Sequence, residues 1–420
     1  MTIKVLLYGL NFSPELTGIG KYTGELAAWL SARGHQVRVV TAPPYYPAWE
    51  VGAGFKNAWQ TEVMDCGSAP AMTSGMTAAP MRVWRCPLWV PTQPGGLKRL
   101  LHLASFALSS FPVMLRQIFW RPDVVWVVEP ALFCAPTAVV VARLCGAKAW
   151  LHVQDFEVNA AFDLGLLRGK WLRSLVLGAE RWLMRRFDVV STISQRMHQR
   201  LLDKGVAPAK ARMAVNWVDM AQFALPSPDG VAAYRRALNI ADGAVVALYS
   251  GNMGGKQGLE VLADVARLCP DVAFVFCGNG AGRSDLVARC AGLANVRFLD
   301  LQPLERLPDL LATAGIHLLP QKAEAADLVM PSKLTGMLAS ARAVVASAHT
   351  GTELATVVQT CGLVVPPGDA VAFAQAVRAL ASSQVLREQL GAAGFLYAQA
   401  HLDKEAVLSA FEAQLNSLIG

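Results

Sequence analysis

Three segments in the second half of the chain place glycines and polar side chains directly after apolar runs that predict strands. They are Ser250–Gly258, Gly278-Asn279-Gly280 and Pro331-Ser332-Lys333. Glycine lets a backbone approach a ligand closely, and a helix N-terminus after such a loop favours an anion. Ser332 is also an N-cap candidate. Together they predict a site for a nucleotide-diphosphate sugar. The predicted donor-binding residues are Gly251, Asn252, Gly255, Lys256, Gly278, Gly280, Pro331, Ser332 and Lys333.

The first half carries a second set of candidates at predicted strand ends. The loop with Glu15, Gly18 and Gly20 precedes a helix. It can contact an acceptor, or it can be a glycine turn with a helix cap. For Glu15 itself, a solvated loop carboxylate is the simpler interpretation. Asp155 follows a predicted strand and can orient the donor sugar or the acceptor hydroxyl, whereas His152 lies within that strand and is expected to face the core.

The chain contains no Asp-x-Asp motif, the acidic pair with which metal-dependent transferases commonly hold a divalent cation. Lys256 and the helix N-termini can offset the diphosphate charge, so we expect no metal and no other cofactor. The nearest acidic pair, Asp155 and Glu157, is a weaker candidate for a metal. We expect the leaving diphosphate to accept the proton of the acceptor hydroxyl, with positive groups stabilising the developing charge.

The elements that must position these residues alternate between short apolar strands and helical patterns. In the first half the predicted strands are Val5–Gly9, Val37–Thr41, Val83–Cys86, Val124–Val128, Ala149–Val153 and Val189–Thr192. In the second half they are Val245–Gly251, Ala273–Gly278, Val296–Phe298, Ile316–Leu319 and Val344–Ala346. Continuous apolar strands separated by helices predict parallel, doubly wound sheets, which bind ligands at the carboxyl ends of their strands. Loops are expected at Tyr45–Trp59, 65–80 and Gly362–Asp369.

A break at Pro226–Gly230 separates the two alternating patterns. The sequence therefore predicts an α/β protein with two Rossmann-like domains that face each other across a cleft. Residues 1–218 would form an N-terminal domain, and 219–400 a C-terminal domain that binds the nucleotide sugar. A helix in 401–420 is expected to cross back onto the N-terminal domain.

Composition limits the partners of the chain. Of its 420 residues 54% are hydrophobic and 16% charged, which excludes a disordered or fibrous protein. The net charge of +7 divides into +11 for residues 1–218 and −4 for 219–420. A basic half suggests an anionic partner, either lipid or nucleic acid. The basic residues accompany Trp and Leu on predicted helices, which favours lipid and no nucleic acid. A dehydrogenase is excluded because fingerprint glycines are missing after the first strand.

Two segments raise the question of a membrane. Leu100–Trp120 is apolar but contains Arg116 and Pro112, so a buried helix or a surface helix fits better than a span. Arg168–Phe187 places Trp and Leu on one helical face and arginines on the other. That pattern fits a helix lying on an anionic membrane, and also a helix packed into the core with a solvated basic face. No signal peptide is recognisable, so a cytoplasmic location is expected, peripheral on the inner face of the cytoplasmic membrane.

Longer motifs carry a resemblance to a known family. Almost the whole chain resembles the GT-B glycosyltransferases of family 4, and more closely their WcaI-type members in colanic acid and exopolysaccharide biosynthesis. The matching segments are Ser13–Glu25, Thr41–Pro47, Gln154–Glu157, Ser191–Ser194, Asn216–Asp219, Lys256–Gly258, Gly278–Gly280, Met330–Thr335 and Val364–Asp369.

The resemblance implies a retaining hexosyltransferase that uses a nucleotide-diphosphate sugar, with GDP-fucose favoured. It also implies a lipid-linked oligosaccharide acceptor, which the membrane-facing domain 1–218 would hold. It implies Glu324 as the first of two glutamates near the donor, but Gly336 occupies the place of the second, and Asn252 replaces an arginine of the phosphate loop. Two alternatives remain: a sugar-nucleotide epimerase, and a non-catalytic membrane-associated scaffold of the same fold.

Overall fold

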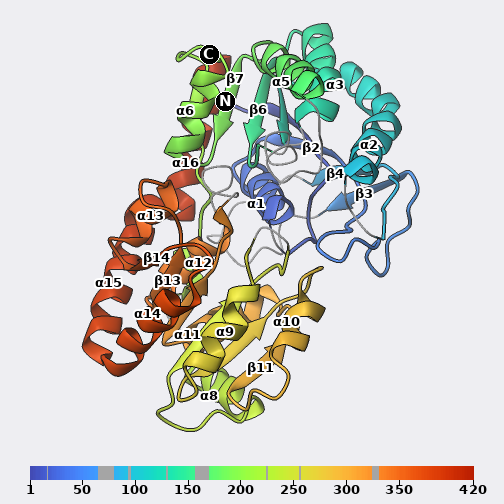
Figure 1. The fold of residues 1–420 in the computed structure, drawn as a ribbon. Helices are drawn as coiled ribbons and strands as arrows, with labels where there is room; N and C mark the ends of the chain where they lie inside the picture. Colours follow the sequence, from blue (N-terminus) through green and yellow to red (C-terminus); the bar gives the residue numbers. More distant parts are fainter. Residues whose placement is uncertain are drawn as a thin grey trace. The chain divides into compact units, whose positions relative to one another are not determined.

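The computed structural model describes residues 1–16, 18–64, 80–92, 96–128, 131–156, 170–223, 226–254, 257–323 and 331–420. Contacts divide the chain into two compact units. Unit 1 comprises Met1–Val215 with Leu408–Gly420, and unit 2 comprises Asn216–Val407. Each unit is a sheet with helices packed on it (Figure 1). The predicted insertion at 65–80, apart from its last residue, lies outside the described residues.

Unit 1, as far as it is described, contains one eight-stranded sheet in the order β3-β4-β2-β1-β5-β6-β7-β8. Neighbouring strands are parallel except for β3, which runs antiparallel to β4 at the edge. The elements are β1 (Lys4–Tyr8), α1 (Gly18–Ala32), β2 (Gln36–Thr41), β3 (Gln60–Met64), β4 (Met81–Arg85), α2 (Gly96–Arg116), η2 (Gln117–Trp120), β5 (Val124–Val128), α3 (Ala131–Cys145), β6 (Lys148–Val153), α5 (Lys170–Met184), β7 (Val189–Thr192), α6 (Gln195–Asp203) and β8 (Ala211–Met213).

The described residues of unit 2 contain a six-stranded parallel sheet in the order β11-β10-β9-β12-β13-β14. Strands β9 and β13 are buried along their whole length, as expected for a sheet covered on both faces. The strands are β9 (Val246–Ser250), β10 (Ala273–Cys277), β11 (Val296–Leu299), β12 (Ile316–Leu319), β13 (Ala343–Ser347) and β14 (Gly362–Val365). The helices are α7 (Met220–Phe223), α8 (Pro228–Ala237), α9 (Glu260–Leu268), α10 (Arg283–Arg289), η3 (Leu304–Arg306), α11 (Leu307–Thr313), α12 (Lys333–Ala339), α13 (Glu353–Val358), α14 (Ala370–Ser382) and α15 (Gln384–His401). The last helix, α16 (Lys404–Ile419), belongs to both units.

The strand order of each sheet reverses at one point, between β1 and β5 in unit 1 and between β9 and β12 in unit 2. Doubly wound sheets bind ligands outside the carboxyl ends of the strands at such a point. The loop with Glu15 follows β1, and Gly251 follows β9 directly. Both candidate loops therefore lie where the topology favours a ligand.

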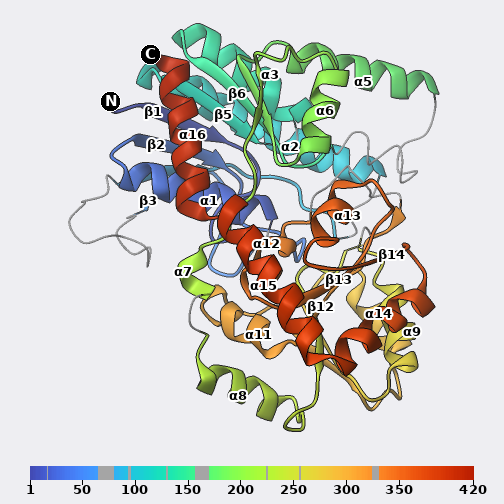
Figure 2. The same cartoon turned by 90° about the vertical axis from the view of Figure 1, so that its left-hand side faces the viewer.

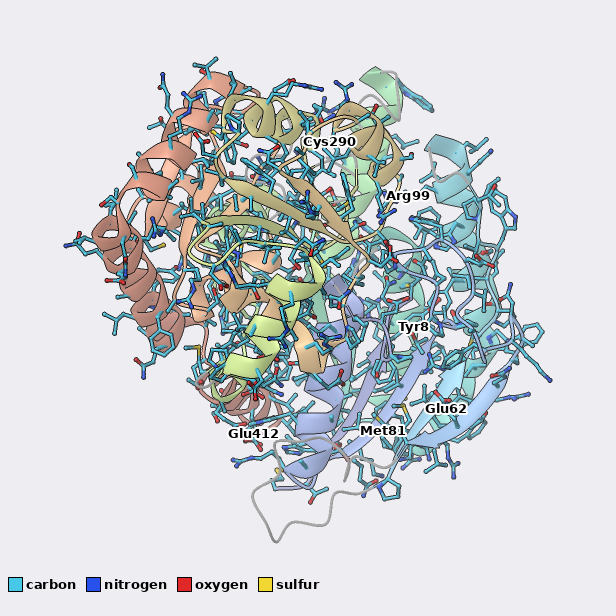
Figure 3. All side chains as sticks on the ribbon, turned by 90° about the horizontal axis from the view of Figure 1, so that it is seen from below. Tyr8, Glu62, Met81, Arg99, Cys290 and Glu412 are labelled. Atoms are coloured by element: carbon cyan, nitrogen blue, oxygen red, sulfur yellow. The ribbon has the colours of Figure 1, made fainter. Side chains whose placement is uncertain are left out.

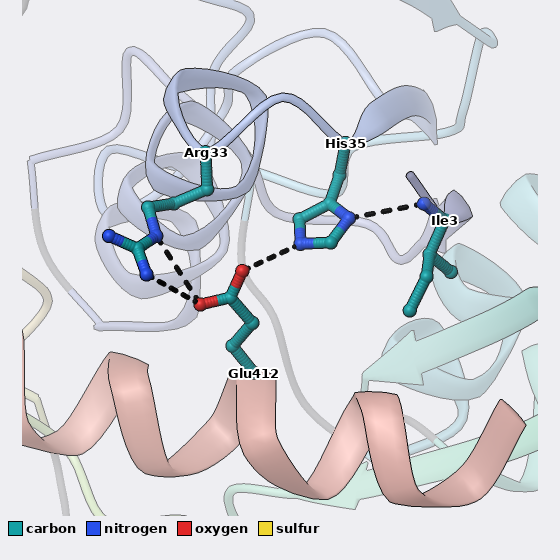
Figure 4. A network of polar contacts seen from close by, with 4 residues as sticks. All are labelled: Ile3, Arg33, His35 and Glu412. Atoms are coloured by element: carbon teal, nitrogen blue, oxygen red, sulfur yellow. Dashed lines mark hydrogen bonds and ion pairs between the residues drawn. The ribbon is translucent and has the colours of Figure 1, made fainter. Parts of the chain in front are cut away.

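Helix α16 begins in unit 2 and ends in unit 1. Its Phe411 packs against the rings of Trp126 and Trp150 on β5 and β6, and Figure 2 shows α16 alongside this sheet. In Figure 4, Glu412 lies between Arg33 and His35 and accepts hydrogen bonds from Arg33, while the His35 ring also contacts the amide of Ile3. The Leu408–Gly420 segment is therefore an integral part of unit 1.

The predicted GT-B class of two Rossmann-like domains is confirmed at the level of each unit, and β5, β7 and β12 have the predicted bounds. One local expectation was wrong, because the expected loop at Gly362–Asp369 begins with strand β14. Strands β3 and β8 were missed. The first residue of β14 has to be glycine, because a Cβ at Gly362 would overlap the carbonyl of Val344. Strand β3 lies at an edge and exposes alternate residues, so it has no continuous apolar run.

The two segments considered for the membrane form α2 and α5. Among the described residues, no helix is long and apolar enough to cross a membrane. In α2, Phe106 and Met114 are fully buried. In α5 the interpretation as a core-packed helix was wrong for Trp171, Leu175 and Trp182, whose side chains are 77%, 55% and 58% exposed.

Candidate functional site

The glycine loops of unit 2 interlock at the carboxyl ends of β9 and β10. The amide of Gly251 donates to the carbonyl of Cys277, and that of Met253 donates to the carbonyl of Asn279, each over 2.9 Å. Gly251, Gly278 and Gly280 have φ values of +132°, +148° and +142°. A Cβ on Gly278 would overlap the Gly251 carbonyl, and one on Gly280 would lie 2.6 Å from Oδ1 of Asn252. Positive φ and these overlaps make glycine the residue that fits these positions.

Lys333, from the first turn of α12, reaches this loop. Its Nζ donates to the hydroxyl of Tyr249 over 2.6 Å and lies 4.0 Å from the centre of that ring. The Tyr249 hydroxyl donates in turn to the carbonyl of Asn252. A Cβ placed on Gly251 would lie 3.4 Å from Cε of Lys333, so the lysine passes directly over the loop. Burial lowers the pKa of Lys333 to about 7.

The remaining predicted donor residues lie just before α12 or outside the described residues. Pro331 and Ser332 precede α12, but the N-cap expectation for Ser332 was wrong. Its backbone is helical (φ −61°, ψ −23°) instead of extended, so its side chain makes no capping hydrogen bond. Gly255, Lys256 and Glu324 lie outside the described residues.

Gly336, which occupies the place of the expected second glutamate, faces the interior of unit 2. A Cβ at this position would lie 3.2 Å from Cδ1 of Leu311 and 3.8 Å from the ring of Phe223. The Cβ of a glutamate at this position would therefore contact apolar side chains. Glycine instead lets α12 pack closely against its neighbours.

Glu15 in unit 1 is buried, so its interpretation as a solvated carboxylate was wrong. Its Oε1 accepts the backbone amides of Tyr45 and Tyr46, each over 3.0 Å, and its Oε2 accepts the side-chain amide of Asn11. Burial raises the pKa of Glu15 to about 7, although these hydrogen bonds act in the opposite direction. A Cβ on Gly20 would lie 2.5 Å from the carboxylate. The carboxylate thus shapes the loop from within, and Gly18, with φ +62°, starts α1.

Asp155 follows β6 and is half-buried, two residues beyond the end of the strand. The expectation that His152 faces the core is confirmed, since it is 4% exposed and stacks on Trp126. Its Nδ1 contacts Oγ of Ser191 at 2.9 Å, and its Nε2 contacts Gln154 at 3.0 Å. Burial lowers the pKa of His152 to about 3, so its ring is neutral. The ring supports Gln154, the residue next to Asp155.

Two family models match the chain. A glycosyl transferase 4-like domain covers residues 17–217, and a glycosyl transferases group 1 domain covers residues 244–383. The chain is 42% identical to the putative colanic acid biosynthesis glycosyl transferase WcaI of Escherichia coli K12, over 97% of this chain and 98% of that protein. The chain belongs to the GT-B glycosyltransferases of family 4.

More distant proteins are similar to this glycosyltransferase in sequence or in fold. Alpha-D-kanosaminyltransferase of Streptomyces kanamyceticus is 26% identical over 50% of this chain and 56% of that protein. Sucrose-phosphate synthase from Thermosynechococcus elongatus has a TM-score of 0.76 at 17% identity, covering 99% of this chain and 98% of that one. HepE from Anabaena, in complex with UDP and glucose, has a TM-score of 0.71 at 16% identity, covering 99% and 100%.

Sequence reasoning missed two residues next to the donor loops of the glycosyltransferase. Tyr249 supports Lys333, and Arg283 pairs with Asp300 at 3.2 Å and leaves its buried Nε without a partner among the described residues. Each had a signal, since Tyr249 ends an apolar run directly before Ser250 and Arg283 follows Gly280 by three residues. In the described ranges, no group of three or more His, Cys, Asp or Glu is arranged to hold a metal ion.

Proposed function

We propose that this glycosyltransferase moves a sugar from a nucleotide-diphosphate sugar to a lipid-linked oligosaccharide in the synthesis of a colanic acid-like exopolysaccharide. The observation that carries the proposal is the convergence of Gly251, Gly278 and Lys333 at the strand ends of unit 2. The UDP and UDP-glucose complexes of HepE support a nucleotide-sugar donor, and the name of the WcaI relative supports the pathway. The resemblance to WcaI-type enzymes favours GDP-fucose and retention of the anomeric configuration.

The residues have distinct roles in this proposal. The glycine loops admit the diphosphate to backbone amides, and Lys333 and Lys256 offset its charge as the bond to the sugar breaks. Asp155 orients the reacting hydroxyl, and Glu324 contacts the donor. Departure of the diphosphate leaves an oxygen that accepts the proton of the acceptor, so no separate protein base is required.

Thermal unfolding with GDP, UDP, ADP and dTDP tests the donor site. A ligand at 100 times its dissociation constant stabilises the folded protein by about 2.7 kcal/mol. We expect one nucleotide class to raise the unfolding temperature and Lys333→Met to reduce that shift. Arg306→Met is the matched control, because Arg306 also lies over a tyrosine ring, 4.6 Å from that of Tyr234. If no nucleotide stabilises the protein, or if both variants lose the shift equally, the donor site is misassigned.

The exposed apolar side chains of unit 1 support a membrane-bound acceptor. Helix α3 packs against both α2 and α5. On these helices large apolar side chains are exposed, namely Leu101, Leu108 and Phe111 on α2, Val140 and Leu144 on α3, and Trp171, Leu175 and Trp182 on α5. Arg181, Arg185 and Arg186 lie at the end of α5. Exposed tryptophan and leucine beside arginine suit the interface of an anionic bilayer.

Co-sedimentation with vesicles tests this surface. We expect the protein to bind phosphatidylglycerol vesicles more tightly than phosphatidylcholine vesicles, and Trp171→Ser with Trp182→Ser to weaken binding. Leu396→Ser, a substitution of another exposed apolar residue on α15 of unit 2, is the control. Equal binding to both vesicle types, or equal loss in the control, would exclude this face as the membrane contact.

A further inference from the structure

A hollow of about 230 Å³ opens in unit 1 between the strand pair β3–β4 and the second half of α2. Figure 3 labels Glu62 and Met81 on this strand pair. The lining includes Trp59, Thr61, Trp84, Val113 and Arg116. Sites for drug-sized ligands measure about 300–1,000 Å³. The hollow therefore has room for one sugar-sized ring and not for a nucleotide sugar.

The aromatic wall of the hollow is held in place. Trp59 is 62% exposed, yet its indole N–H donates to the carbonyl of Ser109 on α2 over 3.0 Å. Pro112, in the same part of the helix, also lines the hollow and cannot donate a backbone hydrogen bond. An exposed indole fixed by its polar end presents a rigid apolar face. The electron-rich face of such a ring attracts the weakly positive C–H groups of a sugar ring.

Arg116 lines the hollow and two further arginines lie beside Trp84, and no carboxylate among the described residues neutralises any of the three. Arg38 and Arg82 lie 5.3 Å and 5.8 Å from the ring of Trp84, and Arg116 is exposed in the last turn of α2. Arg38 donates to the side chain of Gln117, and burial, followed by the charge of Arg82, lowers the pKa of Arg38. Within the described ranges, none of the three pairs with an acidic side chain. The hollow therefore carries a positive field that an anion can satisfy.

The position of the hollow connects it to the candidate acceptor loop. Gln60 pairs with Arg85, the last residue of β4, so Trp59 lies at the carboxyl end of that strand. Arg85 donates to the carbonyls of Ser13 and Ala42, in the loops that follow β1 and β2. Arg85 thus connects the hollow to the loop that contains Glu15, at the end of the sheet where ligands bind.

We propose that this hollow is a subsite for an acidic sugar, in which Trp59 and Trp84 stack on the ring and Arg116 binds its carboxylate. As part of an acceptor-binding surface, the subsite rests on the proposed function, and the acceptor would then be a glycan with a uronic acid residue. A bilayer fits this surface poorly, because it is concave and includes polar groups such as Thr61. Docking to a membrane requires projecting apolar side chains.

Isothermal titration calorimetry on the full chain tests the subsite directly. The acidic probe is a hyaluronan tetrasaccharide, which alternates glucuronate and N-acetylglucosamine, and the neutral probe is chitotetraose. We expect the acidic probe to bind at least about tenfold more tightly, and Trp59→Ala and Arg116→Gln each to weaken it about tenfold. The matched controls, Trp89→Ala and Arg143→Gln, remove an exposed tryptophan and an exposed arginine of unit 1 that do not line the hollow, and they should leave binding unchanged.

Four outcomes would overturn the subsite. Equal binding of both probes would refute the preference for an acidic sugar. An equal loss of affinity in the variants and the controls would refute the location of the site. Displacement by the same concentration of inorganic phosphate indicates an anion site only, and loss of vesicle binding in Trp59→Ala and Arg116→Gln indicates a membrane contact. Nucleotide stabilisation is measured on every variant. A wild-type protein that binds the tetrasaccharide but no nucleotide would refute the proposed function and leave the subsite, whereas the reverse would refute the subsite alone. Trp59→Leu replaces Trp59→Ala if the latter is unstable.

Discussion

The charge of Lys333 should control donor affinity near neutral pH. Its ammonium group contacts the hydroxyl and ring of Tyr249 beside Gly251, and burial lowers its pKa to about 7. A bound diphosphate favours the charged form of the lysine, so binding draws a proton onto Nζ. Raising the pH above about 7 removes that proton from the free protein, and donor affinity should fall.

The pKa sets the size of this effect. With a pKa of about 7, roughly 90% of Lys333 is charged at pH 6 and roughly 10% at pH 8. When only the charged form binds, the apparent dissociation constant equals the intrinsic constant divided by the competent fraction. It should therefore rise roughly tenfold between pH 6 and pH 8.

Titration calorimetry with the nucleotide sugar of the stabilising class, at pH 6, 7 and 8, measures this change. Lys333→Arg keeps its charge throughout, so its affinity should be nearly constant over the same range. Repeating the titration at pH 7.5 in buffers of different ionisation enthalpy counts the protons taken up. A wild-type affinity that does not change with pH, or an equal slope in Lys333→Arg, would refute the role of Lys333 as the titrating cation.

Three further variants test other parts of the structure. Gly278→Ala should lower the free energy of unfolding by about 1–3 kcal/mol more than Gly292→Ala does. Both glycines have positive φ, but only a Cβ at position 278 also overlaps the Gly251 carbonyl. Equal losses in chemical denaturation would contradict this. Glu15→Gln should remove a pH dependence of stability. The pKa of Glu15 is raised from 4.5 to about 7, which stabilises the folded state below pH 4.5, and about 3 kcal/mol of this stability is lost as the pH rises through 7. The unfolding midpoints at pH 5 and pH 8 should therefore differ less in the variant than in the wild type. Lys204→Met should cost about 3–5 kcal/mol because it leaves Glu180 buried without its partner at 2.5 Å, and adding Glu180→Leu should restore much of the loss; no recovery in the double variant would contradict a charge effect.

The central strands were predictable because burial on both faces leaves a mark in the sequence. Val124–Val128 is a continuous apolar run between Asp123 and Glu129, and Ile316–Leu319 is apolar except for His317. The structure begins and ends both strands at these residues. Strand β3 has no such mark, because it lies at the edge of the sheet and, among the described strands, pairs only with β4. Its residues alternate between partly buried and exposed, so the sequence does not distinguish them from the preceding loop.

The candidate site could be predicted where the backbone dictates the residue type. The glycines of the donor loops are required by positive φ, which is a property of each residue's own backbone. Glu15 could not be placed, because the amides that hold it belong to Tyr45 and Tyr46, thirty residues away in the sequence. For the same reason the hollow around Trp59 and Trp84 was not foreseen, as its walls come from three separate elements.

The position of Leu408–Gly420 in unit 1 has a consequence for the order in which the protein can form during translation. The sheet of unit 1 is synthesised by Val215, but Phe411, which covers Trp126 and Trp150, leaves the ribosome only after all of unit 2. At about 5–20 residues per second, that interval lasts roughly 10–40 s. During this time the first sheet carries an uncovered tryptophan surface, and unit 2 can complete its own core first. The half of the protein that is made first is therefore the half that is finished last.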